Sequence, residues 1–315
     1  MNIRCVLSAV LLGLIFVGAT QGQDYPTRPV RIITSPVGGG NDFPARLIAA
    51  ALTGPLGQQF VVDNRPTVLI ADLVAKAPPD GYTLLITGSA HWIGPLVEKF
   101  NYDAVRDFAA ITLVDRSPNV LVVHPSLPAK SVRDVVAIAR ARPGELNVAV
   151  GGPGSSNYVA AVLFEHVAGV KLTRIPYKGN GIAITALLAG EVQSSMDVFA
   201  TANPHIQAGK FRVLGVAAPR RFSLMPEVPT LAEQGHAVSG GTFFALLGPA
   251  RMPQAIVDVL NDEVNKALRD PEVRARLQSL GVEPVGGSPD VLAKAIADEL
   301  AVWTKLVKTQ GLKFD

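Results

Sequence analysis

Along most of the chain, short runs rich in β-branched residues alternate with longer runs whose apolar residues recur at helical spacing. The first pair is VRIIT at 30–34 with a helical pattern at 44–56. Similar pairs follow at 60–63 with 68–76, 82–87 with 92–99, 146–150 with 155–168, 172–177 with 182–189, and 192–197 with 204–208. Repeated strand–helix units predict an α/β protein with parallel sheets covered by helices on both faces.

The C-terminal part is predicted to be helical, over 253–280 and 289–308. Asp270–Pro271 divides the first of these ranges into two helices, because proline and the residue before it both disfavour a continuing helix.

Two extended apolar runs, 117–128 and 241–250, are each closed by a proline. If the chain leaves one sheet at the first run and returns at the second, residues 25–117 plus 242–315 form one lobe and residues 118–241 the other. That arrangement predicts a ligand cleft between two lobes joined by a two-strand hinge. Composition alone leaves open the alternative that both runs are ordinary strands of one continuous sheet.

The first residues have the pattern of a secretory signal peptide, which we place at 1–23. Arg4 precedes an apolar run from Cys5 to Val17, and small and polar residues follow before Asp24. The apolar run is shorter than the ~20 residues of a membrane-spanning helix, so a permanent anchor is the less favoured alternative. Cleavage would remove the single cysteine, which excludes thiol catalysis, disulfides and Cys-based metal sites from the exported product.

Composition narrows the class further. Hydrophobic residues make up 48% and charged ones 17%, and 29 Lys+Arg against 26 Asp+Glu give a net charge of only +3, so a globular protein that does not bind nucleic acid is expected. No metal site or cofactor is expected either. The histidines lack the HxH or HxxxH spacing of metal ligands; they are His91, His124, His166, His205 and His236.

Two glycine-rich loops, SPVGGGND at 35–42 and VGGPGSSN at 150–157, each follow a predicted strand and open a predicted helix. Glycines let backbone N–H groups converge on a ligand, and a helix start favours an anion such as a carboxylate. A tight turn before a capped helix is the structural alternative. The ligand-binding candidates from these loops are Gly38, Gly39, Gly40, Asn41, Asp42, Gly152, Gly154, Ser155, Ser156 and Asn157.

Three further polar residues stand where predicted strands end. Ser89 and His91 lie in TGSAH, at the end of a strand where open α/β sheets bind ligands. Asp197 ends VQSSMD, where an acid can either cap the next helix or contact a ligand. We count Ser89 and Asp197 as binding candidates, and expect His91 to serve a structural role at a helix start.

Taken together and in order, several segments resemble the Bug receptors, the solute receptors of bacterial tripartite tricarboxylate transporters. They are VRIITSPVGGGNDFPARLIA, VVDNRP, LVAKAPPDGYTLL, GGPGSSN, IPYKG, GEVQ, PHIQAGKFRVLGV, PEVPTLAEQG and GVEPVGGSP. The resemblance implies a monomeric periplasmic binding protein of the two-lobed, two-crossover (type II) kind. It also implies ligand capture between residues Gly38–Asp42 of one lobe and Gly152–Asn157, with Asp197, of the other, and delivery to membrane subunits.

Departures from the family pattern affect the ligand rather than the fold. The first loop is one residue shorter than the common PFPPGGGTD, with Asn41 in place of threonine, and Tyr158 stands where a histidine is frequent. After VVDNRP the chain continues with TVLIADL and lacks the usual GAGGNIG stretch.

The sequence therefore predicts a non-enzymatic receptor for a small organic acid or amino acid. One alternative is an exported α/β enzyme with His91 or Asp197 as acid or base, although GxSxG, GxxxxGK[ST] and a complete GxGxxG are all absent. A second is a ligand sensor for a signalling partner.

Overall fold

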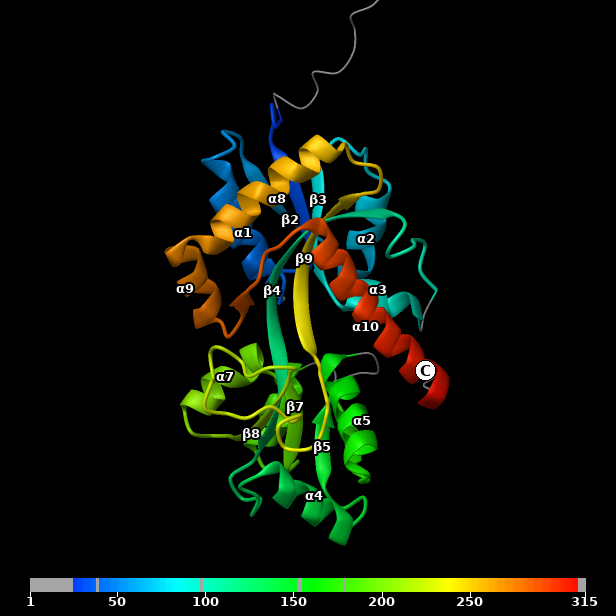
Figure 1. Cartoon of the computed structure of the whole chain (residues 1–315), viewed down its shortest axis with the longest axis vertical. Coiled ribbons are helices and arrows are strands. Elements are labelled where there is room, and N and C mark those ends of the chain that lie inside the picture. Colours follow the sequence, from blue (N-terminus) through cyan, green and yellow to red (C-terminus); the bar gives the residue numbers. More distant parts are fainter. Residues whose placement is uncertain (1–24, 38–39, 97–98, 152–154, 178–179, 311–315) are drawn as a thin grey trace, which may run out of the picture.

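The computed structural model describes residues 25–37, 40–96, 99–151, 155–177 and 180–310, and shows two α/β lobes joined along the long axis of the molecule (Figure 1). The predicted signal peptide, 1–23, lies outside the described residues. Within the described part of the chain, no helix is long and apolar enough to cross a bilayer.

Lobe 1 contains three parallel strands, β1 (Val30–Thr34), β2 (Phe60–Asn64) and β3 (Thr83–Gly88), in the order β2-β1-β3. Its other elements are α1 (Asp42–Thr53), α2 (Thr67–Ala75), α3 (Ala90–Ile93), the 3₁₀ turn η2 (Gly94–Leu96), α8 (Gln254–Arg269), α9 (Pro271–Ser279), β10 (Glu283–Pro284) and α10 (Pro289–Gln310). The two parts of the chain that form this lobe are the blue and cyan N-terminal segment and the orange and red C-terminal one (Figure 1).

Lobe 2 is built from the middle of the chain. Its strands β5 (Asn147–Val150), β6 (Thr173–Pro176) and β7 (Ser194–Val198) are parallel, with β5 between the other two. Its other elements are β8 (Arg212–Ala217), α4 (Val132–Ala141), α5 (Ser156–Ala168), α6 (Asn180–Leu188) and α7 (Phe199–Gln207).

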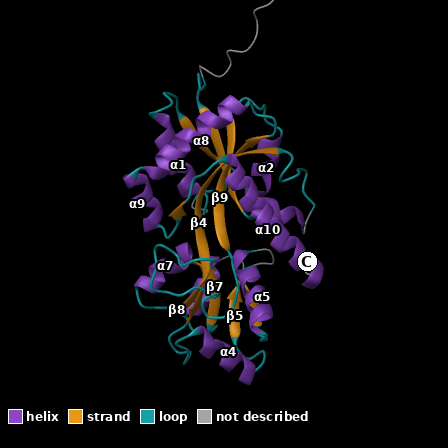
Figure 2. Cartoon of the chain, viewed as in Figure 1, coloured by secondary structure: helices purple, strands orange, loops and turns teal. Residues whose placement is uncertain are grey.

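Two long strands connect the lobes (Figure 2): β4 (Phe108–Val123) and β9 (Gly241–Pro249). The first part of β4, as far as Pro118, pairs antiparallel with β9, which in turn pairs antiparallel with β3. From Asn119 onward β4 pairs with β7 and β8 instead. This change of pairing partners, after Pro118, lies close to the predicted boundary between residues 117 and 118. The division of the chain into 25–117 plus 242–315 and 118–241 remains our prediction.

The parallel strands predicted from the strand–helix units are present in both lobes, but neither sheet is parallel throughout. Both sheets are mixed, because β4 and β9 carry the chain between the lobes and run antiparallel to their neighbours. Helices nevertheless cover both faces, and alternate residues of one strand reach different cores. In β1, Ile32 packs with α1 and α8, whereas Ile33 packs with α2 and α10. In lobe 2, Leu121 packs with α4 and α5, and Val122 with α6 and α7.

Some predicted elements differ from those observed. The helix expected at 204–208 begins at Phe199, directly after β7, and that expected at 92–99 is only a short α-helix and a 3₁₀ turn within 90–96. Helix α4 and strands β8 and β10 were not predicted from the sequence. Helix α4 begins with a capping box in which the Ser131 side chain accepts a hydrogen bond from the Asp134 N–H, which is a recognisable helix-start signal.

Candidate functional site

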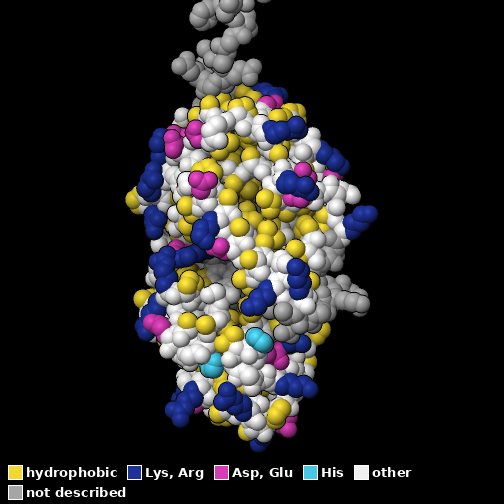
Figure 3. Space-filling view, turned by 45° about the vertical axis from the view of Figure 1, so that its right-hand side comes forward, with side chains coloured by type: hydrophobic (Ala, Val, Ile, Leu, Met, Phe, Trp, Pro, Cys, Tyr) yellow, Lys and Arg dark blue, Asp and Glu magenta, His cyan; other side chains and the backbone are white. Residues whose placement is uncertain are grey.

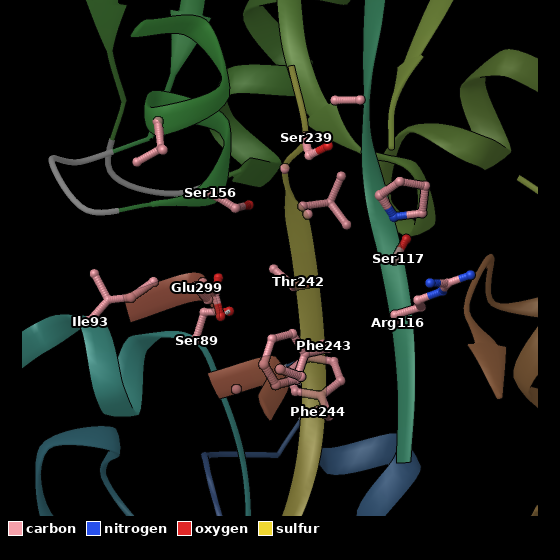
Figure 4. A pocket seen from close by; sticks show the side chains of 18 of the residues that line it. Ser89, Ile93, Arg116, Ser117, Ser156, Ser239, Thr242, Phe243, Phe244 and Glu299 are labelled. Atoms are coloured by element: carbon pink, nitrogen blue, oxygen red, sulfur yellow. Dashed lines mark hydrogen bonds between the residues drawn. The ribbon is translucent and has the colours of Figure 1, made fainter. Parts of the chain in front are cut away.

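A cleft of about 880 Å³ lies between the lobes and is lined by residues of both. The surface is hollowed where the lobes meet (Figure 3), and the side chains around the hollow come from lobe 1, lobe 2 and the two connecting strands (Figure 4). Of the sequence-predicted candidates, the lining includes Gly40, Asn41, Ser89, Ser155 and Ser156. The cleft therefore brings one part of each glycine-rich loop to the same space.

The loop before α1 reaches the cleft through Gly40 and Asn41. Asn41 is the N-cap of α1, but its side chain makes no cap hydrogen bond. Its amide oxygen accepts from the Ser35 hydroxyl at 2.6 Å and its amide nitrogen donates to the Ile86 carbonyl at 3.3 Å. A Cβ on Gly40 would lie 3.1 Å from the Phe244 ring, so the loop and β9 approach closely. Gly38 and Gly39 lie outside the described residues.

Asp42 is buried and does not line the cleft. One carboxylate oxygen accepts from the Asn64 side-chain amide at 2.8 Å and lies 3.0 Å from Arg46 Nε. These contacts tie the first turn of α1 to the end of β2. In this structure Asp42 therefore holds the loop rather than facing the solute space.

The loop before α5 is organised around Asn157, which is fully buried. Its side-chain oxygen accepts hydrogen bonds from the Gly151 N–H at 3.0 Å, the Ser155 hydroxyl at 2.6 Å and the Tyr158 N–H at 2.9 Å. Ser155 and Ser156 line the cleft, while Asn157 lies behind them. Gly152 and Gly154 lie outside the described residues.

Asp197 is fully buried at the end of β7, and only its neighbour Val198 lines the cleft. One oxygen of Asp197 accepts from the Val198 N–H at 2.8 Å and the Thr201 hydroxyl at 2.9 Å. Burial raises the pKa of this carboxyl to about 6, although both hydrogen bonds act to lower it. These bonds tie the end of β7 to the first turn of α7, but they do not make Asp197 the cap of that helix, whose N-cap residue is Val198.

His91 is buried behind the cleft and does not line it. Its ring stacks on Tyr102 with centroids 5.0 Å apart and meets Phe108 edge-on at 4.5 Å. Burial lowers the pKa of His91 to about 4, so the imidazole is neutral near pH 7. The expected structural role matches this packing.

The most informative lining residue that sequence reasoning missed is Glu299 of α10. One of its carboxylate oxygens accepts from the Trp92 indole N–H at 2.6 Å and from the Ser89 hydroxyl at 3.1 Å. Burial raises the pKa of Glu299 to about 7, against the lowering effect of these hydrogen bonds. Residues 289–308 were identified as a helix, but nothing in that pattern shows which face meets a cleft.

Arg116 of β4, also missed, lies on the other side of β9 (Figure 4). Its guanidinium pairs with Glu283, at 2.8 Å from Nε and 2.6 Å from Nη2. Glu283 also accepts from the Ser223 hydroxyl at 2.9 Å, which links β10 of lobe 1 to lobe 2. Arg220 and Arg221 of lobe 2 line the same cleft.

The floor between these charged groups is formed by β9. Thr242, Phe243 and Phe244 lie between Glu299 and Arg116 in Figure 4. Phe243 stacks on Trp92 with ring centroids 4.8 Å apart. The cleft thus has an apolar floor, hydroxyl groups from both lobes and ionisable groups on two sides, with no cluster of metal-ligating side chains among the described residues.

A two-lobed α/β protein with its cleft between the lobes and two connecting strands has the architecture of a periplasmic solute-binding protein. Comparison with known proteins agrees. The family model described as "Tripartite tricarboxylate transporter family receptor" matches residues 44–312, and the chain belongs to this family.

Relatives and solved structures support that membership over nearly the whole chain. Protein BugT of Bordetella pertussis is 34% identical, over 92% of this chain and 91% of its own. A solved R. palustris protein with adipate is 36% identical, with a TM-score of 0.80 over 92% of this chain and 99% of its own. MatC from Rhodopseudomonas palustris with bound malate is 31% identical, with a TM-score of 0.75 over 90% and 100%.

Proposed function

We propose that this protein is an extracytoplasmic receptor that closes its two lobes on a small carboxylate-bearing solute and delivers it to the membrane subunits of a tripartite transporter. The observation that carries the proposal is the cleft itself, in which hydroxyl and guanidinium donors of both lobes face one space. Carboxylate oxygens accept hydrogen bonds from such donors, and lobe closure strengthens these bonds by excluding water.

The starts of helices α1 and α5 add to this anion preference. Asn41 and Ser155 are their N-cap residues, both line the cleft, and neither side chain caps its helix. A helix start carries a partial positive charge that favours an anion. The solved relatives with adipate and malate are consistent with a small organic acid as ligand.

Periplasmic residence and the absence of catalysis belong to the same proposal. The family is one of receptors, and the two residues considered as acid or base do not face the cleft, since His91 packs among aromatic rings and Asp197 bonds the start of α7. Two-lobed receptors work by a shift between open and closed forms, which needs differential affinity for the ligand and no chemical step.

The test is thermal unfolding of the ligand-stripped mature protein against a panel of mono-, di- and tricarboxylates and amino acids. At about 100 times its dissociation constant, a ligand adds about 2.7 kcal/mol of stability. For a chain of this size that raises the midpoint by several degrees.

Two variants locate the binding. Ser156→Trp places a bulky ring on a half-buried position that lines the cleft, whereas Val167→Trp changes an exposed position at the other end of α5. We expect the stabilising acid to act on the wild type and on Val167→Trp but not on Ser156→Trp. If no acid stabilises the wild type, the receptor proposal fails.

A further inference from the structure

Ionisable groups line the cleft on two sides of strand β9, and the strand register fixes how far apart they lie. The sheet order is β3-β9-β4. Gly88 pairs with Phe244 and Arg116 with Phe243, so Ser89, one residue beyond Gly88, and Arg116 flank the same part of β9. With strands spaced about 4.8 Å apart, the two backbones are separated by roughly 10 Å. A small solute can span that distance.

The Ser89 side of the cleft is acidic. Glu299 is held there by the Ser89 hydroxyl and the Trp92 indole N–H, both bonded to the same carboxylate oxygen. The side chain of Trp303, which also lines the cleft, is a further hydrogen-bond donor that acts to lower the pKa of Glu299. Within the described part of the chain, no Lys or Arg forms an ion pair with Glu299. Asp298, which also lines the cleft, is paired with Lys294 at 2.7 Å and its side chain is 66% exposed. Glu299 therefore lines the solute space and, once ionised above its pKa of about 7, is a carboxylate that no basic side chain of the described chain neutralises.

The opposite side is basic. Arg116, Arg220 and Arg221 line it. Glu283 pairs with Arg116 and lies 3.9 Å from Arg220, and Glu233, which does not line the cleft, pairs with Arg221. Three guanidinium groups facing two carboxylates leave one excess positive charge. The cleft thus has opposite electrostatic character at its two sides, with the apolar floor of β9 between them.

We propose that Glu299 is a specificity-determining residue whose carboxylate accepts a hydrogen bond from a donor group of the bound acid. This inference rests on the receptor function proposed above. The ligand would then be a carboxylate whose other end carries a hydroxyl or amino group, with its acid group toward Arg116. A second carboxylate at the Glu299 end would meet a like charge in a half-buried site, which costs binding free energy. A donor at that end would satisfy the carboxylate instead.

The experiment compares matched probes by isothermal titration at about pH 8.5, where Glu299 is ionised. Each set has one chain length and three end groups: succinate, 4-hydroxybutyrate and 4-aminobutyrate, then adipate, 6-hydroxyhexanoate and 6-aminohexanoate. In the wild type the hydroxy or amino acid of at least one set should bind about tenfold more tightly than its dicarboxylate. In Glu299→Gln that ratio should contract to within about threefold, because the repelling charge is gone.

Glu272→Gln is the matched control, since it makes the same change of charge at a residue of α9 that does not line the cleft. Its ratio should equal that of the wild type, because Glu272 is exposed and paired with Arg276. Equal ratios in wild type and Glu299→Gln, or an equal change in Glu272→Gln, would overturn the inference and leave the receptor proposal intact. Absence of binding by every acid in every variant would instead mark failure of the receptor proposal itself.

A wild-type measurement covers the case in which Glu299→Gln does not fold. Burial raises the pKa of Glu299 to about 7, so lowering the pH from about 8.5 to about 6 protonates it. The disadvantage of the dicarboxylate should then shrink several-fold. Around Glu299, Ser89, Trp92 and Trp303 do not titrate in this range, and His91 beside Trp92 stays neutral because burial lowers its pKa to about 4. An unchanged ratio at the two pH values would contradict the inference.

Discussion

Replacing Asn157 by alanine tests whether one buried amide organises the loop before α5. Its side-chain oxygen accepts from two backbone N–H groups, those of Gly151 and Tyr158, and from the Ser155 hydroxyl. Alanine removes the acceptor and leaves these donors without it. A buried donor left unpaired costs about 1–3 kcal/mol, whereas the half-buried Ser155 hydroxyl can turn to water.

Counting the two backbone donors at about 1–3 kcal/mol each, we expect Asn157→Ala to lower the free energy of unfolding by about 2–6 kcal/mol. For a chain of this size, that corresponds to a midpoint roughly 5–15 °C lower. Urea unfolding followed by circular dichroism measures the free energy, and a thermal scan measures the midpoint. Ligand affinity should fall as well, because Ser155 and Ser156 lose their fixed position at the cleft.

The control is Ser156→Ala, the residue directly before. Ser156 lines the cleft and its side chain makes no hydrogen bond within the described part of the chain. Its removal should change the free energy of unfolding by no more than about 0.5 kcal/mol while weakening ligand binding. The reasoning is refuted if Asn157→Ala unfolds within that same margin of the wild type, or if Ser156→Ala is destabilised equally.

Two further predictions concern β4 and β9. Burial raises the pKa of Asp115 to about 8, above its ordinary value of 3.8. Between pH 3.8 and about 8, the folded state therefore holds a proton that the unfolded state releases. The free energy of unfolding should decline as the pH rises through this range. In urea titrations from about pH 5 to 8, Asp115→Asn should show a smaller decline than the wild type, and parallel curves would contradict this assignment. A Cβ on Gly241 would lie 2.5 Å from the Ser117 carbonyl oxygen, so Gly241→Ala should lower unfolding stability by about 1–3 kcal/mol. Gly54, where an added Cβ meets no atom within 4 Å, provides the control alanine, and equal stabilities of the two variants would count against the clash.

Local pattern was enough to predict most of the elements. The run 30–34 coincides with β1, and Asp270–Pro271 separates α8 from α9 because Asp270 caps α9 with hydrogen bonds to two backbone N–H groups. These signals are short-range and therefore visible in sequence. The direction of β4 and β9 was not predicted, because strand pairing depends on partners far along the chain.

Candidate site residues divide in the same way. The glycine-rich loops were identified because their chemistry is contiguous, and Ser155, Ser156 and Asn41 do reach the cleft. Asp197 illustrates the limit of such reasoning. Its position at a strand end suits a helix cap as well as a ligand contact, and only the hydrogen bonds to Val198 and Thr201 show what it holds.

From the residues alone we could predict the succession of strands and helices, the two anion-suited loops and the family resemblance, since all of these follow from residues close together in the chain. Which charges face the solute depends on how the chain folds. Strand β4 shifts register before Asp115, so the face on which Arg116 lies cannot be obtained by counting alternate residues. Glu299 reaches Ser89 only because α10 packs beside α3, more than 200 positions away in sequence.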